Sequence, residues 1–172
     1  MNELKTFITR LHKEKYPDAD IIFLAGSVIR GEGTKTSDLD LVVIYDSLPN
    51  AYRDSYNYGG WPVEAFVHDP QTLEYFIRKV DAPSGVPSLA AMVSEGIELP
   101  SPTGLSQRLK QLANEAFQAG PPRWTATDVD NSRYLISDLI EDLREPRTPC
   151  EMYAIASQLF TAISNHYFRS QG

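Results

Sequence analysis

The sequence predicts an α+β domain built on a mixed sheet, followed by a C-terminal helical region. Residues 21–25 and 39–45 are apolar, β-branched runs typical of buried strands, and residues 61–69 alternate apolar and polar positions as a half-buried strand does. After residue 104 the apolar residues recur at the period of helices. With 172 residues, of which 42% are hydrophobic and 23% charged, the chain is long enough to bury a core.

An amphipathic helix is predicted before the first strand. Its apolar residues recur at helical spacing, and basic side chains occupy its other side. It should end near Tyr16, because the residue before a proline is disfavoured in the helical conformation. The apolar residues are Leu4, Phe7, Ile8 and Leu11. We expect this helix to cover the sheet.

Two aspartates open the second predicted strand. Because side chains alternate faces along a strand, Asp38 and Asp40 share one face and lie roughly 6 to 7 Å apart at the backbone. Two neighbouring carboxylates at a buried strand end repel each other unless a cation joins them. Hard oxygen ligands favour Mg2+ or Mn2+, which usually bridge to substrate phosphates. The pair therefore predicts a site for a metal-bound polyphosphate.

The connector between the two strands predicts the phosphate-binding half of this site. Gly26 allows the backbone to approach a ligand closely, and Ser27 can offer its hydroxyl and backbone N–H to a phosphate. Arg30 and Lys35 add positive charge nearby.

These residues carry a family resemblance. Gly26-Ser27, with Asp38-Leu39-Asp40 starting eleven positions after Ser27 and leading into an apolar strand, resembles the signature of the nucleotidyltransferase superfamily. This superfamily includes DNA polymerase β and the aminoglycoside nucleotidyltransferases. The run GSVIRGEGTKTSDLDLVVIY is most similar to the bacterial, kanamycin-nucleotidyltransferase-like branch. The resemblance implies a third carboxylate on a neighbouring strand. Glu64 fills that position in the strand 61–69, where many members have aspartate.

The resemblance implies an enzyme that moves a nucleoside monophosphate, AMP from ATP or another NTP, to a hydroxyl of a small-molecule acceptor and releases pyrophosphate. Asp38, Asp40 and Glu64 would hold Mg2+ or Mn2+. Gly26, Ser27 and Arg30 would hold the β- and γ-phosphates, and Ser37 would lie next to the metal. An aminoglycoside-like acceptor, as in antibiotic resistance, is one expectation.

Other interpretations remain open. A Ser-Asp-x-Asp motif by itself is often structural, because its Ser and Asp side chains form a cap and a turn where a strand begins. A protein adenylyltransferase of the minimal toxin–antitoxin type, whose acceptor is a partner protein, would carry the same catalytic residues. A nucleotide-binding module without turnover would also bind the nucleotide, although it would be free to lose the complete carboxylate set.

Residues 46–61 are predicted to form a polar loop rich in aromatic residues. Its tyrosines could stack on a base or on a ring of the substrate, and Arg53 could reach a phosphate. Alternatively, the loop could fold over the edge of the sheet, held there by packing among its own aromatic side chains.

Asp69-Pro70 predicts a helix start. A short helix is predicted over 88–95, within a stretch punctuated by proline and glycine. We place a domain boundary there, with a catalytic domain over 1–100 and a helical region over 101–172.

Three helices are predicted in the C-terminal region. The first stops at Gly120, the second opens with Thr127 and Asp130 as a capping box, and the third opens at Thr148. Asp138 and Asp142 lie one turn apart on the second helix. Either could be the general base that takes the acceptor's proton, or both could belong to a solvated face.

The last helix has a broad apolar side that predicts a homodimer. Proteins that this chain resembles usually continue for several more helices. A truncated form, a short variant and half of an interface are therefore alternatives for the region 101–172.

The formal net charge of −7 argues against a nucleic-acid partner, because affinity for a phosphate backbone depends on clustered lysine and arginine. It favours a cationic or neutral acceptor. The single cysteine, Cys150, excludes an internal disulfide. No run resembles a signal peptide or a membrane span, so we expect a cytoplasmic protein without membrane partners.

Overall fold

The computed structural model describes residues 2–170, which form two compact units that divide between Pro121 and Pro122. The first unit holds the sheet and the second holds two helices. Helix α6 (Gly104–Ala119) packs against α5 (Ser88–Glu95) and therefore belongs to the sheet unit. The domain boundary predicted between residues 100 and 101 lies before α6, whereas the two compact units divide after it. As a functional division, the predicted boundary stays a prediction.

A mixed sheet in the described chain confirms the predicted α+β class. Its strand order is β3-β4-β2-β1-β5. The strands are β1 (Ile21–Ala25), β2 (Leu39–Ile44), β3 (Tyr52–Tyr58), β4 (Trp61–His68) and β5 (Ile97–Leu99). β2 and β4 are parallel, whereas the other pairs are antiparallel. β2 is central and buried along most of its length, as its continuous apolar run predicts.

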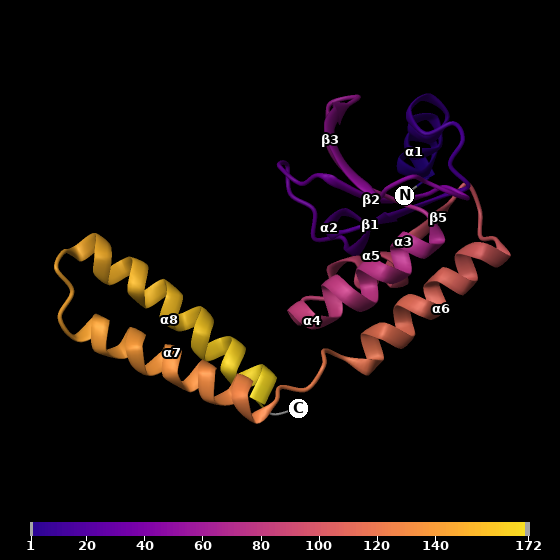
Figure 1. The fold of residues 1–172 in the computed structure, drawn as a ribbon. Coiled ribbons are helices and arrows are strands. Elements are labelled where there is room, and N and C mark those ends of the chain that lie inside the picture. The colour runs from indigo at the N-terminus through magenta and orange to yellow at the C-terminus, as the bar shows by residue number, and fades with distance from the viewer. Residues whose placement is uncertain (1, 171–172) are drawn as a thin grey trace. The chain divides into compact units, whose positions relative to one another are not determined.

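Helices cover both faces of this sheet (Figure 1). On one face α1 (Asn2–Lys15) buries Ile8 and Leu11 against β1, β2 and β4. On the other face the core includes Leu73 of α3 (Pro70–Phe76), Val93 of α5 and Leu109 of α6. A π-helical turn η1 (Ile77–Asp81) and a short α4 (Ala82–Ser84) continue α3. The four-residue α2 (Ser27–Arg30) lies between β1 and β2 in the chain.

The prediction of a loop over the whole of residues 46–61 is wrong, because residues 52–58 form strand β3, paired with β4. Gly59 and Gly60 both have positive φ, +56° and +88°, and form a two-residue hairpin turn between the paired residues Tyr58 and Trp61. Tyr56 donates a hydrogen bond to the Tyr16 hydroxyl, at 3.0 Å. The tyrosines at 56 and 58 therefore pack toward α1 rather than forming a free stacking surface.

The short edge strand β5 was also not predicted. The prolines and glycines of residues 81–104 are typical of loops and turns, yet residues 97–99 form a strand that pairs with β1. The short helices predicted inside this stretch and after Asp69 are confirmed. Asp69 caps α3 by accepting a hydrogen bond from the backbone N–H of Thr72, at 2.8 Å.

The second unit consists of α7 (Ala126–Arg144) and α8 (Pro149–Ser170), which lie side by side (Figure 1). The capping box of α7 is formed by Thr125 and Asp128, two residues earlier than predicted. The sequence contains two overlapping Thr-x-x-Asp matches, and the helix begins at the first of them.

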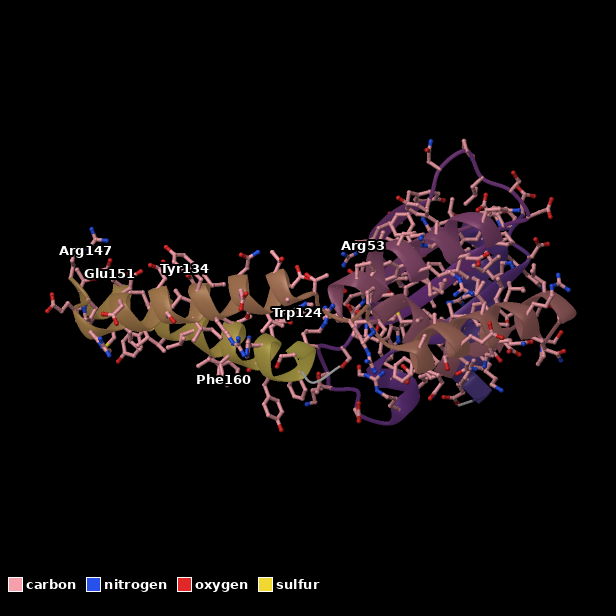
Figure 2. The ribbon with its side chains drawn as sticks, turned by 60° about the horizontal axis from the view of Figure 1, so that its bottom comes forward. Arg53, Trp124, Tyr134, Arg147, Glu151 and Phe160 are labelled. Carbon is pink, nitrogen blue, oxygen red and sulfur yellow. The ribbon has the colours of Figure 1, made fainter. Side chains whose placement is uncertain are left out.

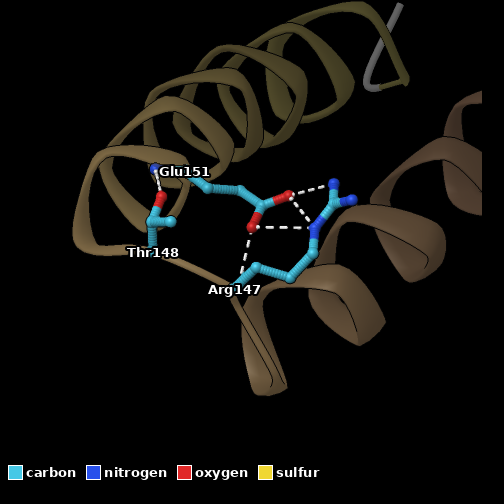
Figure 3. A network of polar contacts seen from close by, with 3 residues as sticks. All are labelled: Arg147, Thr148 and Glu151. Atoms are coloured by element: carbon cyan, nitrogen blue, oxygen red, sulfur yellow. Dashed lines mark hydrogen bonds and ion pairs between the residues drawn. The ribbon is translucent and has the colours of Figure 1, made fainter.

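The start of α8 is predicted correctly. Thr148 accepts a hydrogen bond from the backbone N–H of Glu151, at 3.1 Å, and the Glu151 carboxylate accepts bonds from the backbone and guanidinium of Arg147 (Figure 3). These contacts satisfy a free donor at the first turn and order the connection between the two helices.

The apolar sides of this helical pair remain partly uncovered. On α7, the helical spacing of residues 135, 136, 139, 140 and 143 predicts that these apolar side chains pack inward. Leu139 is buried, but Leu135 and Ile140 are exposed. That part of the prediction is wrong, because two helices alone cannot cover both sides of a broad stripe. Figure 2 shows Tyr134 and Phe160 projecting from α7 and α8, and both are more than 70% exposed.

No helix in residues 2–170 combines the length and apolar character needed to cross a membrane.

Candidate active site

Three carboxylates converge where β2 and β4 begin. The parallel register of the two strands places Asp40 directly opposite Glu64. Asp38 lies two residues before Asp40, just ahead of the strand, and all three side chains are half-buried. One ligand oxygen from each carboxylate lies within 4.8 Å of the others. This donor set fits a hard divalent cation such as Mg2+ or Mn2+.

The electrostatics of the cluster favour a bound cation. Burial raises the pKa of the Asp40 carboxyl above its usual value, and the neighbouring charges of Asp38 and Glu64 raise it further. Arg30 and Arg53 oppose this effect only in part. A divalent cation would relieve both the repulsion and the burial cost.

Gly26 makes the approach of the β1–α2 turn to this cluster possible. Its φ is +81° with ψ at −167°, a conformation essentially restricted to glycine. A Cβ at this position would lie 1.9 Å from Asp40 Oδ2. The backbone therefore lies against the Asp40 carboxylate at a place where no side chain fits.

The hydroxyls of Ser27 and Ser37 meet across the connector, 3.4 Å apart. Ser37 Oγ also accepts a hydrogen bond from the backbone N–H of Thr34, at 2.7 Å. The connector is thus folded back on itself beside the carboxylates. The two serines come together as the phosphate-binding prediction requires, and their role as ligands of a phosphate stays a prediction.

Arg30 carries two ion pairs. Its guanidinium donates to Glu32 at 2.9 Å and to Glu95 of α5 at 2.7 Å. To hold a β- or γ-phosphate it would have to exchange these carboxylates for phosphate oxygens. Lys35 is exposed on the same connector.

Arg53 is the site residue whose place the sequence reasoning missed. From β3 its guanidinium donates a hydrogen bond to the Glu64 carboxylate and lies over the Phe66 ring, 5.1 Å from its centroid. The signal was present in Gly59-Gly60, since a two-residue turn there fixes the register that sets Arg53 opposite Phe66.

This ion pair gives a first prediction. A cation bound by Glu64 competes with the Arg53 guanidinium, so Arg53→Gln should tighten Mn2+ binding by up to about fivefold, the value of a partly exposed ion pair. Isothermal titration calorimetry measures the change. Arg78→Gln, which breaks a surface pair with Glu74, should leave Mn2+ affinity unaltered. Weaker binding in Arg53→Gln would mean instead that Arg53 orients Glu64 for the metal.

His68 lies further along β4 and is 3% exposed. Burial lowers its pKa from 6.5 to about 4, although Asp69 acts in the opposite direction. Its ring packs edge-on against Phe76 at 5.1 Å. The folded protein therefore holds this imidazole neutral at pH 7.

The buried imidazole should make stability depend on pH. The unfolded chain binds a proton at His68 below about pH 6.5, whereas the folded chain binds it only below about pH 4. The free energy of unfolding should therefore fall by about 3 kcal/mol as pH drops through this window. Urea unfolding of wild type and His68→Gln at several pH values separates the contribution of His68 to this pH dependence from the contribution of the carboxylates. A difference between them that stays constant from pH 7 to pH 4 would contradict the assignment.

The two candidate bases, Asp138 and Asp142, are both exposed and lie on α7 in the second unit. The structure of each unit by itself does not bring them to the carboxylates. Their role as general base stays a prediction.

The fold and the site define a class of protein: a mixed-sheet domain with a three-carboxylate candidate metal centre beside a glycine-serine turn. Residues 3–82, which contain the three carboxylates, the glycine-serine turn and strands β1 to β4, match the family model of the nucleotidyltransferase domain. This match supports a nucleotidyltransferase domain in the N-terminal part of the chain, as the sequence motif predicted. Such domains generally use a divalent metal and an NTP. Membership of the kanamycin-like branch stays a prediction.

No curated protein sequence matches the chain. Among solved structures, the chain is similar to a nucleotidyltransferase-like protein from Exiguobacterium sibiricum 255-15, with 17% sequence identity and a TM-score of 0.47. The similarity covers 97% of this chain and 56% of that one, so the chain spans little more than half of that protein.

Proposed function

We propose that the protein is a divalent-metal-dependent nucleotidyltransferase that moves a nucleoside monophosphate, AMP from ATP in the first instance, to a hydroxyl of a small-molecule acceptor. The observation that carries the proposal is the convergence of Asp38, Asp40 and Glu64 within 4.8 Å, inside the segment that matches the nucleotidyltransferase domain. The folded glycine-serine connector beside them supports it.

In this mechanism the three carboxylates would hold Mg2+ or Mn2+. The bound cation would supply charge neutralisation for the triphosphate and the developing pyrophosphate. Gly26 lets the backbone close on the phosphates, and the hydroxyls of Ser27 and Ser37 donate to phosphate oxygens. Arg30 adds positive charge once its ion pairs with Glu32 and Glu95 break.

The transfer itself balances without another reactant. The acceptor oxygen forms a bond to the α-phosphorus, the bond from that phosphorus to the bridging oxygen breaks, and pyrophosphate leaves. The proton of the hydroxyl passes to a general base, for which Asp138 and Asp142 are the candidates, or to solvent.

A second candidate function is adenylation of a partner protein. The exposed aromatic and aliphatic side chains of α7 and α8 favour a macromolecular partner, either a protein acceptor or a second copy of this chain. A binding-only module is disfavoured because the carboxylate set is complete. Sedimentation velocity tests the homodimer.

Pyrophosphate release from Mg-ATP tests the function. The assay is run with and without hydroxyl-bearing acceptors, including aminoglycosides, and repeated without the divalent metal. Acceptor-dependent and metal-dependent release would support small-molecule transfer. Mg2+-dependent ATP binding without release would point to a protein acceptor or to binding alone.

A further inference from the structure

A pocket of about 350 Å³ opens on the sheet face that carries the three carboxylates. Its size falls in the lower range of small-molecule sites. It is formed by β3 and β4 together with α3 and α5, all within the first unit. Its apolar walls include Phe66, Phe76, Leu89 and Met92, and its polar lining residues include Arg53, His68, Asp81 and Ser88.

The pocket adjoins the metal site along β4. Glu64, Phe66 and His68 are alternate residues of this strand, so their side chains project from the same face. The Arg53 guanidinium links the two sites, because it bonds to Glu64 and lies over Phe66. A molecule in the pocket would therefore have one end beside the carboxylates.

The strand order decides which substrate could lie there. The Gly26–Ser27 turn is on the β1 side of β2, whereas the pocket is on the β4 and β3 side. In phosphoryl transfer the attacking and leaving oxygens are roughly in line, on opposite sides of the phosphorus. If the triphosphate lies at the turn, the attacking hydroxyl arrives from the side of the pocket.

The walls of the pocket indicate the chemistry of its occupant. Most of the surface is aromatic or aliphatic, which suits a ring. Nδ1 of the buried His68 has no hydrogen-bond partner among the described residues. A neutral imidazole nitrogen can donate or accept according to its tautomer, and a hydroxyl can satisfy either. The pocket lining carries one cationic side chain, Arg53, and one carboxylate, Asp81, so their charges offset each other and give a polyamine such as an aminoglycoside no net charge to bind.

We propose that this pocket binds the acceptor, and that the acceptor is an uncharged, ring-bearing small molecule with at least two hydroxyls. One hydroxyl hydrogen-bonds to His68, and another attacks the α-phosphorus. The attacking oxygen forms a bond to that phosphorus, the bond to the bridging oxygen breaks to release pyrophosphate, and the hydroxyl proton passes to a general base or to solvent. The inference rests on the proposed nucleotidyl transfer and narrows its substrate class.

A pocket-filling variant tests the proposal. Ser88 lines the pocket from an exposed position on α5, so Ser88→Phe fills the space without disturbing the core. Val86→Phe introduces the same ring two residues away, at a side chain that is 63% exposed and outside the pocket lining, and is the matched control. The probes are aryl glycosides such as 4-methylumbelliferyl β-glucoside, with kanamycin as the polycation.

Two readouts separate this inference from the proposed function. Binding of the fluorescent probe is measured without nucleotide, and transfer is measured with labelled ATP. We expect Ser88→Phe to weaken probe binding and raise the KM for aryl glycosides at least tenfold, while Val86→Phe leaves both within twofold and Mg-ATP affinity is constant in all three proteins. His68→Gln should weaken binding less, because it keeps a polar group.

Probe binding that is absent, or equal in Ser88→Phe and wild type, would overturn the pocket assignment. Transfer to kanamycin with a KM unaffected by Ser88→Phe would overturn the acceptor class and leave nucleotidyl transfer standing. Probe binding lost in Ser88→Phe, but with no transfer to any acceptor, would overturn the pocket's role as the acceptor site together with the proposed function.

Discussion

Replacing Asp40 with asparagine is expected to lower nucleotidyl transfer by at least about 10²–10³-fold, the cost of removing one electrostatic contact to a transition state. Asp40 is the central member of the carboxylate cluster, opposite Glu64 and against Gly26. Asparagine keeps the shape of the side chain but removes the charge that would hold a cation. Since the substitution also relieves repulsion from Asp38 and Glu64, the melting temperature without metal should stay the same or rise.

The control for this experiment is Asp46→Asn. Asp46 is exposed and lies just beyond the opposite end of β2, so the same chemical change there leaves the cluster intact. Turnover and Mn2+ affinity are measured for both variants, with circular dichroism as the check on folding. Unchanged turnover in Asp40→Asn would remove the metal assignment.

Gly26→Ala should cost at least about 100-fold in turnover, because displacements of about 1 Å at a reacting site can cost that much. The new Cβ would lie 1.9 Å from Asp40 Oδ2, so either the turn or the carboxylate must move. The glycine-only backbone conformation adds strain of about 1–3 kcal/mol. We expect weaker Mn2+ binding along with the lost activity.

Gly31→Ala is the matched control. Gly31 also has a positive φ, +77°, at the end of the same short helix, but a Cβ there would meet nothing within 4 Å among the described residues. It should lose about 1 kcal/mol of stability to left-handed strain and keep its activity. Equal loss of turnover in both variants would show that general loosening of the connector, rather than contact with Asp40, is responsible.

Arg53 links the metal site to the neighbouring pocket. In the described protein it is bound to Glu64, so cation binding would release its guanidinium near the pocket mouth. Binding of a cation at the carboxylates should therefore change the affinity of the pocket for its ligand, and ligand binding should change the affinity for the cation to the same degree. The Arg53→Gln variant used for Mn2+ titration also removes this link.

Local residue patterns were enough to predict the sheet core and half of the site. The apolar runs of β1 and β2, and the alternation of Asp38 with Asp40, express backbone geometry that neighbouring residues decide. The capping side chains of Asp69 and Thr148 likewise act within one helical turn. The carboxylate pair and the first turns of α3 and α8 were thus readable from the sequence.

Glu64 depended on more than a local pattern. Its placement rested on a family resemblance, because nothing in residues 61–68 alone states that β4 pairs in parallel with β2. In contrast, β3 was readable from Gly59-Gly60 but was missed, since its polar, tyrosine-rich composition favoured a loop. The register set by that turn is what brings Arg53 to Glu64.

The sequence by itself determined the central strands, the paired aspartates, the glycine-serine turn and the helical C-terminal region, because each is encoded within a few consecutive residues. Only the tertiary structure decided the contact of Gly26 with Asp40, the Arg53–Glu64 ion pair and the burial of His68 beside a pocket. The physical reason is that these features join segments far apart in the chain, whose distances are set by strand register and helix packing.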